Sequence, residues 1–254
     1  MIDYETFEEK FIYYFSVYGI DFDARIIKDF YIFTNYLLSE NKKYNLTAIK
    51  NIDEIIVKHY IDSVIVLKYF EIPENAKIID IGTGAGLPGL PLLIMRKDLR
   101  ITFLDSSHKK INFIKNTAGL INTQANFYNG RAEDYGRKPD VRETYDFAVS
   151  RAVAKLSVLC EFAAPLIKPG GVFIAYKSRN IDEEIFGAER AFRMLDLAVT
   201  GIADFDLNVV CMGGVSPPAN QRENNKRVLV KIKKFSETSP KYPRKFSDIT
   251  KKPL

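Results

Sequence analysis

Hydrophobic residues recur every three or four positions through the first seventy residues, and this spacing predicts α-helices. The pattern favours a first helix near 3–18 and a second near 23–40. A third periodic stretch consists of Ile52, Ile55, Ile56, His59, Ser63 and Leu67, and it stops before Pro73. We expect the aromatic residues on these helices to pack in a core.

After Pro73, short apolar runs alternate with helical segments, a pattern typical of βαβ units and a parallel sheet. Strands are expected over 77–81, 100–105, 126–130, 145–150, 172–177 and 228–233, with a further strand near 197–204. Helices are expected over 87–97, 107–119, 153–167 and 182–196, and an exposed loop over 212–225. Pro169-Gly170-Gly171 predicts a sharp turn into the fifth strand. The sequence therefore predicts an α/β fold with six or seven strands and helices on both faces of the sheet.

The composition is that of an ordinary globular protein. Its 254 residues, 46% hydrophobic and 27% charged, suit one α/β domain with an extension and exclude disordered, collagen-like and solenoid classes. We expect a helical cap (1–72), a Rossmann-like domain (73–236) and a basic tail (237–254). No apolar run approaches the roughly 20 residues that cross a bilayer, and the acidic first residues are unlike a secretory signal, so we expect a cytoplasmic protein. Cys160 and Cys211 form no metal-binding or disulfide pattern; we expect buried thiols, no metal site and a monomer.

Basic charge is concentrated late in the sequence. The net charge is +5, but residues 222–254 contain eleven Lys and Arg against three Asp and Glu. Such a segment suits a polyanion, because Lys and Arg near phosphates release counterions, although a solvated surface would have the same composition. The candidate phosphate contacts are Arg222, Lys226, Arg227, Lys241, Arg244, Lys245, Lys251 and Lys252.

A glycine-rich loop directly after the first expected strand is the most informative stretch. It reads Asp80-Ile81-Gly82-Thr83-Gly84-Ala85-Gly86-Leu87-Pro88-Gly89, and its glycines let a ligand approach the backbone at the carboxyl end of the sheet. The loop also satisfies the GxGxxG pattern of dinucleotide sites, with Asp105 placed 21 residues after Gly84. The negative charge of Asp80 opposes a pyrophosphate but favours S-adenosylmethionine, which carries an ammonium and a sulfonium. We therefore favour S-adenosylmethionine as the cofactor.

Further candidates follow the other strands. Asp105 ends the second strand, where its carboxylate can bind both ribose hydroxyls or can cap the next helix. Gly130-Arg131-Ala132-Glu133-Asp134 would lie beside the adenine. Arg151 follows the fourth strand, and its permanent cation could hold the donor's carboxylate or an RNA phosphate. His59 lies three residues before Asp62, and it either hydrogen-bonds to that acid in the core or reaches the cleft and stacks on a base.

A series of short motifs extends over about four-fifths of the chain. They are Asn45-Leu46-Thr47-Ala48-Ile49, His59-Tyr60-Ile61-Asp62-Ser63, the glycine loop, Leu104-Asp105-Ser106, Arg131-Ala132-Glu133, Ser150-Arg151-Ala152, Tyr242-Pro243-Arg244-Lys245 and Lys251-Lys252-Pro253-Leu254. In this order they resemble the RsmG family, also called glucose-inhibited division protein B. The chain departs from the family at Tyr176-Lys177-Ser178, where Lys-Gly is usual, and at Ser247-Asp248-Ile249-Thr250, which replaces a glycine-containing stretch.

The resemblance implies a class I S-adenosylmethionine-dependent methyltransferase that methylates N7 of one guanine in 16S ribosomal RNA of the small ribosomal subunit. The resemblance and the loop together assign donor contacts to Asp80, Gly82, Gly84, Leu87, Asp105, Ala132, Glu133 and Arg151. Guanine N7 has a lone pair and no proton, so its methylation needs no general base and depends on positioning, for which Arg151 is the candidate.

Three alternatives remain open at this point. They are a nicotinamide-dependent oxidoreductase, an RNA-binding module with a vestigial cofactor pocket, and a methyltransferase that acts on another RNA or on a protein. If the basic tail binds RNA, removing residues 241–254 should weaken RNA binding with a shallower salt dependence and leave donor affinity almost unchanged.

Overall fold

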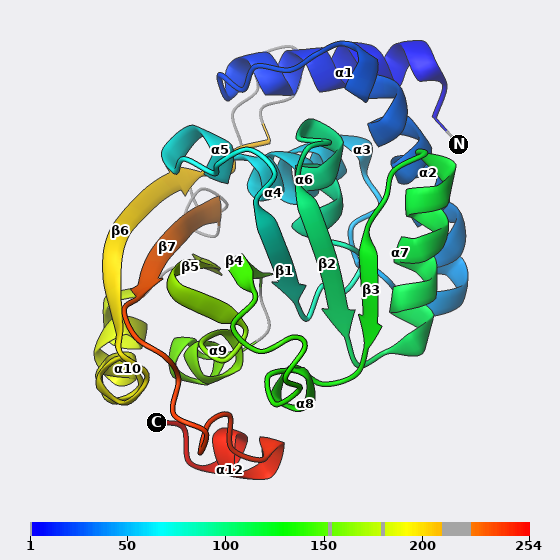
Figure 1. The fold of residues 1–254 in the computed structure, drawn as a ribbon. Coiled ribbons are helices and arrows are strands. Elements are labelled where there is room, and N and C mark those ends of the chain that lie inside the picture. Colours follow the sequence, from blue (N-terminus) through cyan, green and yellow to red (C-terminus); the bar gives the residue numbers. More distant parts are fainter. Residues whose placement is uncertain (1, 152–153, 179–180, 210–224) are drawn as a thin grey trace.

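The computed structural model describes residues 2–151, 154–178, 181–209 and 225–254, and it contains a seven-stranded sheet (Figure 1). The strands are β1 (Lys77–Ile81), β2 (Arg100–Asp105), β3 (Asn126–Asn129), β4 (Tyr145–Arg151), β5 (Ile167–Ser178), β6 (Leu197–Asp206) and β7 (Lys226–Lys234). Their order across the sheet is β3-β2-β1-β4-β5-β7-β6. Strands β1 to β5 pair in parallel. The expectation of a parallel sheet is wrong for one part, because β7 runs antiparallel between β5 and β6.

Helices cover both faces of the sheet, as the sequence predicts. They include α1 (Tyr4–Val17), α2 (Arg25–Tyr44), α6 (Gly89–Met95), α7 (His108–Leu120), α8 (Ala132–Tyr135), α9 (Leu156–Ala163), α10 (Ile181–Leu195) and α12 (Phe246–Lys251). Alternate residues of β5 divide between two buried clusters. Ile174 and Tyr176 pack in the cluster of α1, α2, α6 and α7, whereas Phe173 and Ala175 pack in that of α9 and α10.

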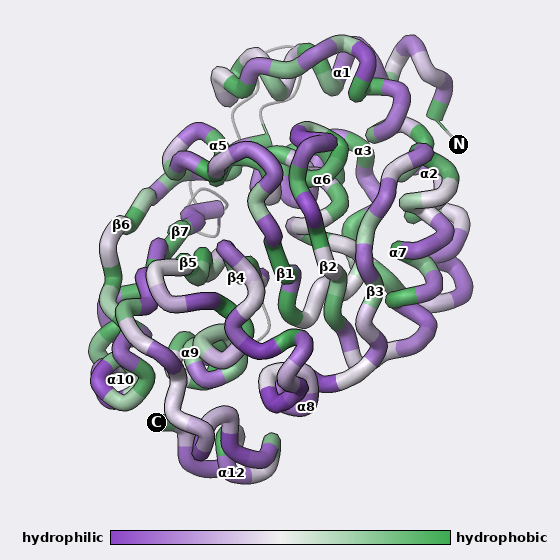
Figure 2. Tube along the Cα trace, viewed as in Figure 1, coloured by the Kyte–Doolittle hydropathy of each residue, from purple (hydrophilic) through white to green (hydrophobic). Residues whose placement is uncertain are grey.

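The central strands are hydrophobic because both of their faces are covered. Figure 2 shows helix α6 and the carboxyl-terminal part of β1 as hydrophobic, and α8 and α12 as mainly hydrophilic. Helices α1 and α2 add an aromatic core, in which Phe11 stacks on Phe15 and also contacts Phe30. This aromatic core is continuous with the cluster on one face of the sheet, so the N-terminal helices pack directly on the strands.

The third helical stretch differs from its expected form. It consists of α3 (Ile52–Ile55), a π-helical segment η1 (Ile56–Ile61), α4 (Asp62–Val64) and α5 (Val66–Tyr69). A π-helix has a wider hydrogen-bond spacing than an α-helix and is common at functional sites. Hydrophobic periodicity did not reveal it, because one wider turn shifts the apolar positions by only a single residue.

The turn at Pro169-Gly170-Gly171 lies inside β5 rather than before it. Gly170 has φ +82°, in the left-handed region that favours glycine. The pairing of β4 with β5 is irregular at this point, between Tyr145 and Phe147 of β4. The strand therefore begins at Ile167, and α9 before it is shorter than the helix expected over 153–167.

Other expectations have mixed outcomes. Cys160 is a buried free thiol, whereas Cys211, Arg222 and most of the loop expected over 212–225 lie outside the described residues. Within the described ranges, no helix is long and apolar enough to cross a membrane. The same residues contain no cluster of His, Cys, Asp and Glu that could hold a metal ion.

Candidate functional site

The glycine loop joins β1 to α6, and the side chain of Asp80 stabilises it through hydrogen bonds. Gly82, Gly84 and Gly86 have φ values of +68°, +59° and +85°, so the loop uses the left-handed conformations that glycine adopts easily. Asp80 Oδ2 accepts hydrogen bonds from Thr83 Oγ1 at 2.6 Å and from the Gly89 amide at 2.9 Å. A side chain at position 89 would bring Cβ within 2.5 Å of the Phe103 ring, so this close approach requires glycine.

Asp80 therefore differs from its expected role. The carboxyl group is fully buried behind the loop and does not line the cavity described below. It is therefore not positioned to contact the ammonium group of a bound donor directly. Its Oδ1 atom is buried without a hydrogen-bond partner. Burial raises the pKa of Asp80 to about 6. Asp80 thus fixes the shape of the glycine loop.

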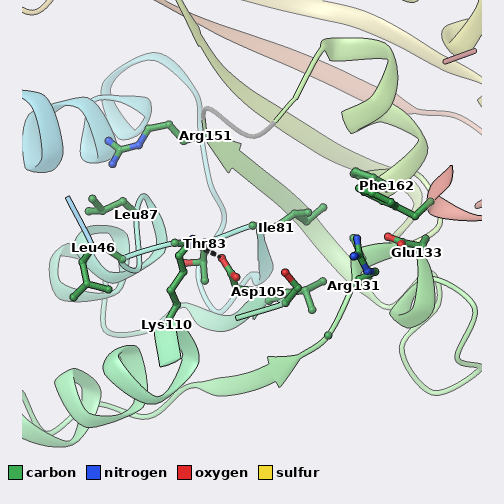
Figure 3. Close-up of a pocket in the computed structure, with 18 of the residues that line it drawn as sticks. Leu46, Ile81, Thr83, Leu87, Asp105, Lys110, Arg131, Glu133, Arg151 and Phe162 are labelled. Atoms are coloured by element: carbon green, nitrogen blue, oxygen red, sulfur yellow. Dashed lines mark hydrogen bonds and ion pairs between the residues drawn. The ribbon is translucent and has the colours of Figure 1, made fainter. Parts of the chain in front are cut away.

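A cavity of about 490 Å³ lies at the carboxyl ends of β1 to β4, where the expected site residues converge. Figure 3 shows Arg151 and Leu46 at one end of it, Thr83 and Asp105 in the middle, and Arg131, Glu133 and Phe162 at the other end. Of the expected donor contacts, the cavity is lined by Gly82, Gly84, Leu87, Asp105, Ala132, Glu133 and Arg151.

Asp105 sits in the middle of this cavity and connects two loops. Its Oδ2 accepts a hydrogen bond from the Gly84 amide at 3.0 Å, and its Oδ1 accepts one from the Ser107 amide at 2.8 Å. Lys110 Nζ lies 3.8 Å from Oδ2. The carboxylate thus stabilises the turn that leads into α7 and also faces the cavity, so the two roles considered for it are compatible.

Two phenylalanines form one end of the cavity, beside the start of α8. The rings of Phe162 and Phe246 are nearly parallel, with centroids 6.4 Å apart. The Arg131 guanidinium lies 4.2 Å from the centroid of Phe246, a cation–π contact. Next to them, burial raises the pKa of Glu133. Neither aromatic residue was expected at the site, because Phe162 reads as part of an apolar helix face and Phe246 lies in a basic segment.

Arg151 forms the opposite end and is held by the π-helical segment and α4. Its Nη1 donates to Asp62 Oδ2 at 2.8 Å and, at 3.3 Å, to Ser63 Oγ. The carbonyl oxygens of Lys58 and His59 each lie 3.4 Å from the same nitrogen. The side chains of Arg151 and Asp62 are only 14% and 7% exposed, so this is a largely buried ion pair that fixes the guanidinium.

His59 is buried, but the prediction that it hydrogen-bonds to Asp62 is wrong. Its Nε2 lies 2.8 Å from Thr47 Oγ1, and Asp62 accepts instead from Arg151. Burial, together with the nearby Arg151 charge, lowers the pKa of His59 to about 4, so the ring is neutral at pH 7. The ring also borders the cavity.

A second cavity of about 710 Å³ adjoins the first and shares His59 and Arg151 with it. Five cationic side chains and two carboxylates line it: Lys58, Arg151, Lys177, Lys226 and Arg227, with Asp62 and Glu184. The Tyr176-Lys177-Ser178 stretch, which departs from the family pattern, also belongs to its wall. The two cavities meet at the Arg151 side chain.

The other described basic candidates lie on the C-terminal segment (residues 235–254) and line neither cavity. Lys241, Lys245, Lys251 and Lys252 are exposed on the segment that includes α12. Arg244 does not belong with them, because it is ion-paired with Glu161, whose side chain is fully buried. Removing residues 241–254 was expected to leave donor affinity almost unchanged, but Phe246 in this segment lines the first cavity, so the truncation would also remove one of the residues that line it.

Comparisons with known proteins agree on one family. A family model named GidB and described as "rRNA small subunit methyltransferase G" matches residues 26–209. The chain is 42% identical over 237 residues to "Ribosomal RNA small subunit methyltransferase G" of Clostridium botulinum strain Loch Maree, which covers 93% of this chain and 94% of that protein. It is also 42% identical over 223 residues to the protein of the same name from Desulforamulus reducens, with 87% of each chain covered.

Solved structures resemble the fold at low sequence identity. Precorrin-6y C5,15-methyltransferase from Geobacter metallireducens aligns with a TM-score of 0.51 at 12% identity, covering 68% of this chain and 87% of that one. The YcgJ protein of Bacillus subtilis aligns with a TM-score of 0.53 at 14% identity, covering 70% and 100%. These likenesses, together with the mixed seven-stranded sheet, identify the fold as the Rossmann-like fold of class I methyltransferases.

Proposed function

The chain belongs to the rRNA small subunit methyltransferase G family, and from this premise we propose that it transfers a methyl group from S-adenosylmethionine to N7 of a guanine in 16S ribosomal RNA. A member of this family is a methyltransferase of small-subunit ribosomal RNA, so a nicotinamide-dependent oxidoreductase is no longer a candidate. The observation that carries the proposal is the first cavity, whose lining brings together the glycine loop, Asp105 and Arg151.

The residues of the first cavity fit S-adenosylmethionine in size and in chemistry. A volume of about 490 Å³ suits a ligand of this size. Asp105, in the middle, is placed to accept hydrogen bonds from the ribose, and Ala132 and Glu133 border the adenosine end. Arg151, at the opposite end, is placed for the carboxylate of the methionine part. Gly82, Gly84 and Leu87 lie between these ends and leave room for the chain of the ligand.

Methyl transfer to N7 depends mainly on positioning the guanine and the donor. When bound, S-adenosylmethionine would supply an electrophilic methyl group on a sulfonium. Guanine N7 has a lone pair and no proton, so it would bond to the methyl carbon as the methyl–sulfur bond breaks, S-adenosylhomocysteine leaves, and the positive charge passes from sulfur to the guanine. No general base is needed, and His59, whose pKa is lowered to about 4, would be a weak proton acceptor in any case. Arg151 is always protonated and is held by Asp62, so its task is to orient charged groups. Alignment of the reacting atoms can contribute roughly 7 to 11 kcal/mol.

The second cavity is the place we propose for the target nucleotide. It begins at His59 and Arg151, where the methionine end of the donor would lie, so a base entering there approaches the methyl group. Its wall carries an excess of cations, which suits a ribose-phosphate chain. Lys226 and Arg227, on β7, are placed to contact phosphates. We propose that the acceptor is 16S ribosomal RNA or the small subunit, in the cytoplasm.

A Lys226→Ala variant tests this placement. Lys226 is exposed and lines the second cavity, so its loss should raise KM for small subunits about fivefold and reduce the salt slope of RNA binding by about one. Donor affinity should stay unchanged. The matched control is Lys233→Ala, which removes another exposed lysine of β7 that contacts Phe235 and does not line the cavity. Steady-state kinetics at several salt concentrations make the comparison, and equal effects of the two substitutions would contradict the placement.

The function itself is tested by methyl transfer from tritiated S-adenosylmethionine. Small subunits and naked ribosomal RNA, both from cells that lack this gene, are the two acceptors. Nucleoside analysis should find the label in 7-methylguanosine. Donor binding without label in either acceptor would overturn the proposed substrate and would favour another RNA or a protein as the acceptor.

A further inference from the structure

The C-terminal segment, residues 235–254, is bound tightly along the side of the molecule that carries α9. Two arginines of the main domain donate to its backbone: Arg142 Nη1 to the Tyr242 carbonyl at 2.9 Å, and Arg137 Nη2 to the Pro243 carbonyl at 2.7 Å. Ile249 and Leu254 are buried in the same hydrophobic cluster as α9. These contacts fix the path of the segment just before α12.

An ion pair fixes the segment at its centre. Arg244 Nη2 donates to Glu161 Oε2 at 2.6 Å, and Arg244 Nε donates to Oε1 at 2.9 Å, a fork geometry that sets the orientation of both side chains. The Arg244 amide also donates to Oε1, at 2.8 Å. Because the Glu161 side chain is fully buried, this carboxylate would be left without compensation if the segment moved away.

The ion pair lies directly beside the aromatic end of the donor cavity. Glu161 precedes Phe162 in α9, and Arg244 comes two residues before Phe246 in the segment. The two rings lie nearly parallel, at an angle of 4°, and both line the first cavity. Phe246 is nevertheless 41% exposed, although its ring contacts both Phe162 and the Arg131 guanidinium. Its open surface is therefore available to a ligand in that cavity.

We propose that Phe246 completes the adenosine end of the donor site, so that docking of the C-terminal segment and binding of the methyl donor stabilise each other. This inference rests on the proposed function, because it takes S-adenosylmethionine as the donor. A flat, apolar adenine placed among Ala132, Phe162 and Phe246 gains contact with a ring that would otherwise face water. By linkage, a ligand that binds only when the segment is docked also stabilises the docked segment.

The test is calorimetric titration with S-adenosylhomocysteine and with adenosine. Phe246→Ala should weaken both ligands by about tenfold, the scale of one base–aromatic contact. Phe246→Tyr should keep nearly native affinity, because the ring is retained. The matched control is Phe235→Ala, which removes an exposed ring of the same segment that contacts Lys233 and does not line the cavity. In turnover, Phe246→Ala should raise KM for S-adenosylmethionine and leave KM for small subunits unchanged.

Hydrogen exchange gives an independent measurement that does not depend on a substitution. In the native protein, S-adenosylhomocysteine should slow amide exchange in residues 244–251. Native affinity in Phe246→Ala, equal losses in Phe235→Ala, or unchanged exchange in the segment would each overturn the inference. Absence of S-adenosylhomocysteine binding to the native protein would instead overturn the proposed donor, so the two failures are distinguishable.

Discussion

An Arg151→Met variant is expected to lose methyl transfer by roughly 100-fold or more and to lose about 3–5 kcal/mol of folding stability. Both effects follow from the position of Arg151 between the two cavities. Its guanidinium is the cation closest to Asp62, and the pair is largely buried, so the substitution leaves a carboxylate in a poorly solvated place. Methionine keeps much of the volume of the side chain but provides neither charge nor hydrogen bonds.

A second substitution separates the two effects. Asp62→Asn in the Arg151→Met background removes the uncompensated charge and should restore most of the stability, measured by urea unfolding. Methyl transfer should remain low, because the group that orients the donor is still missing. If the double variant instead recovers native activity, Arg151 serves only to neutralise Asp62, and its proposed role toward the donor is wrong.

An Asp80→Asn variant should change how stability depends on pH. Burial raises the pKa of Asp80 to about 6 in the folded protein, from the ordinary value of 3.8. A raised carboxyl pKa contributes stability that is present below the unfolded pKa and is lost as pH rises through the folded pKa. Between pH 4 and pH 7, the free energy of unfolding of the native protein should therefore fall by about 2 to 3 kcal/mol relative to that of the variant. Each unit of pKa shift corresponds to about 1.4 kcal/mol.

The measurement is urea unfolding of both proteins across this pH range. Asp98→Asn is the control, because the ion pair with Arg96 lowers the pKa of Asp98 to about 2 and places its titration below the range. The difference in unfolding free energy between the native protein and this control should not change across this pH range. A flat difference for Asp80→Asn as well would show that the buried carboxyl group titrates at an ordinary pH. Because Asp80 holds Thr83 and Gly89, the variant should also report whether the charge is needed to shape the glycine loop.

The sequence predicts best what depends on neighbouring residues. The limits of β1 and β2 agree with expectation, because each is a short, mainly apolar stretch with an aspartate at or next to its end, Asp80 in β1 and Asp105 in β2. Seven of the eight expected donor contacts, all but Asp80, line the first cavity, since the carboxyl ends of parallel strands meet at one edge of the sheet.

Contacts between distant segments were not predictable in the same way. The partner of Asp62 is Arg151, 89 positions later in the sequence, and the partner of Glu161 is Arg244, 83 positions later. Nothing in the local pattern distinguishes these ionic residues from solvated ones. The position of Phe246 follows from the second pair, so an aromatic residue of the donor cavity was read only as part of a basic tail.

The position of β7 has a consequence for synthesis of the chain. Residues 226–234 lie between β5 and β6, and among the described residues β6 pairs only with β7, so β6 has no strand partner until β7 has been made. A nascent chain that ends before residue 226 exposes two open strand edges, which are templates for pairing with other chains. The last steps of folding must therefore wait until nearly the whole sequence has left the ribosome, and premature termination in this region should give aggregates rather than a shortened enzyme.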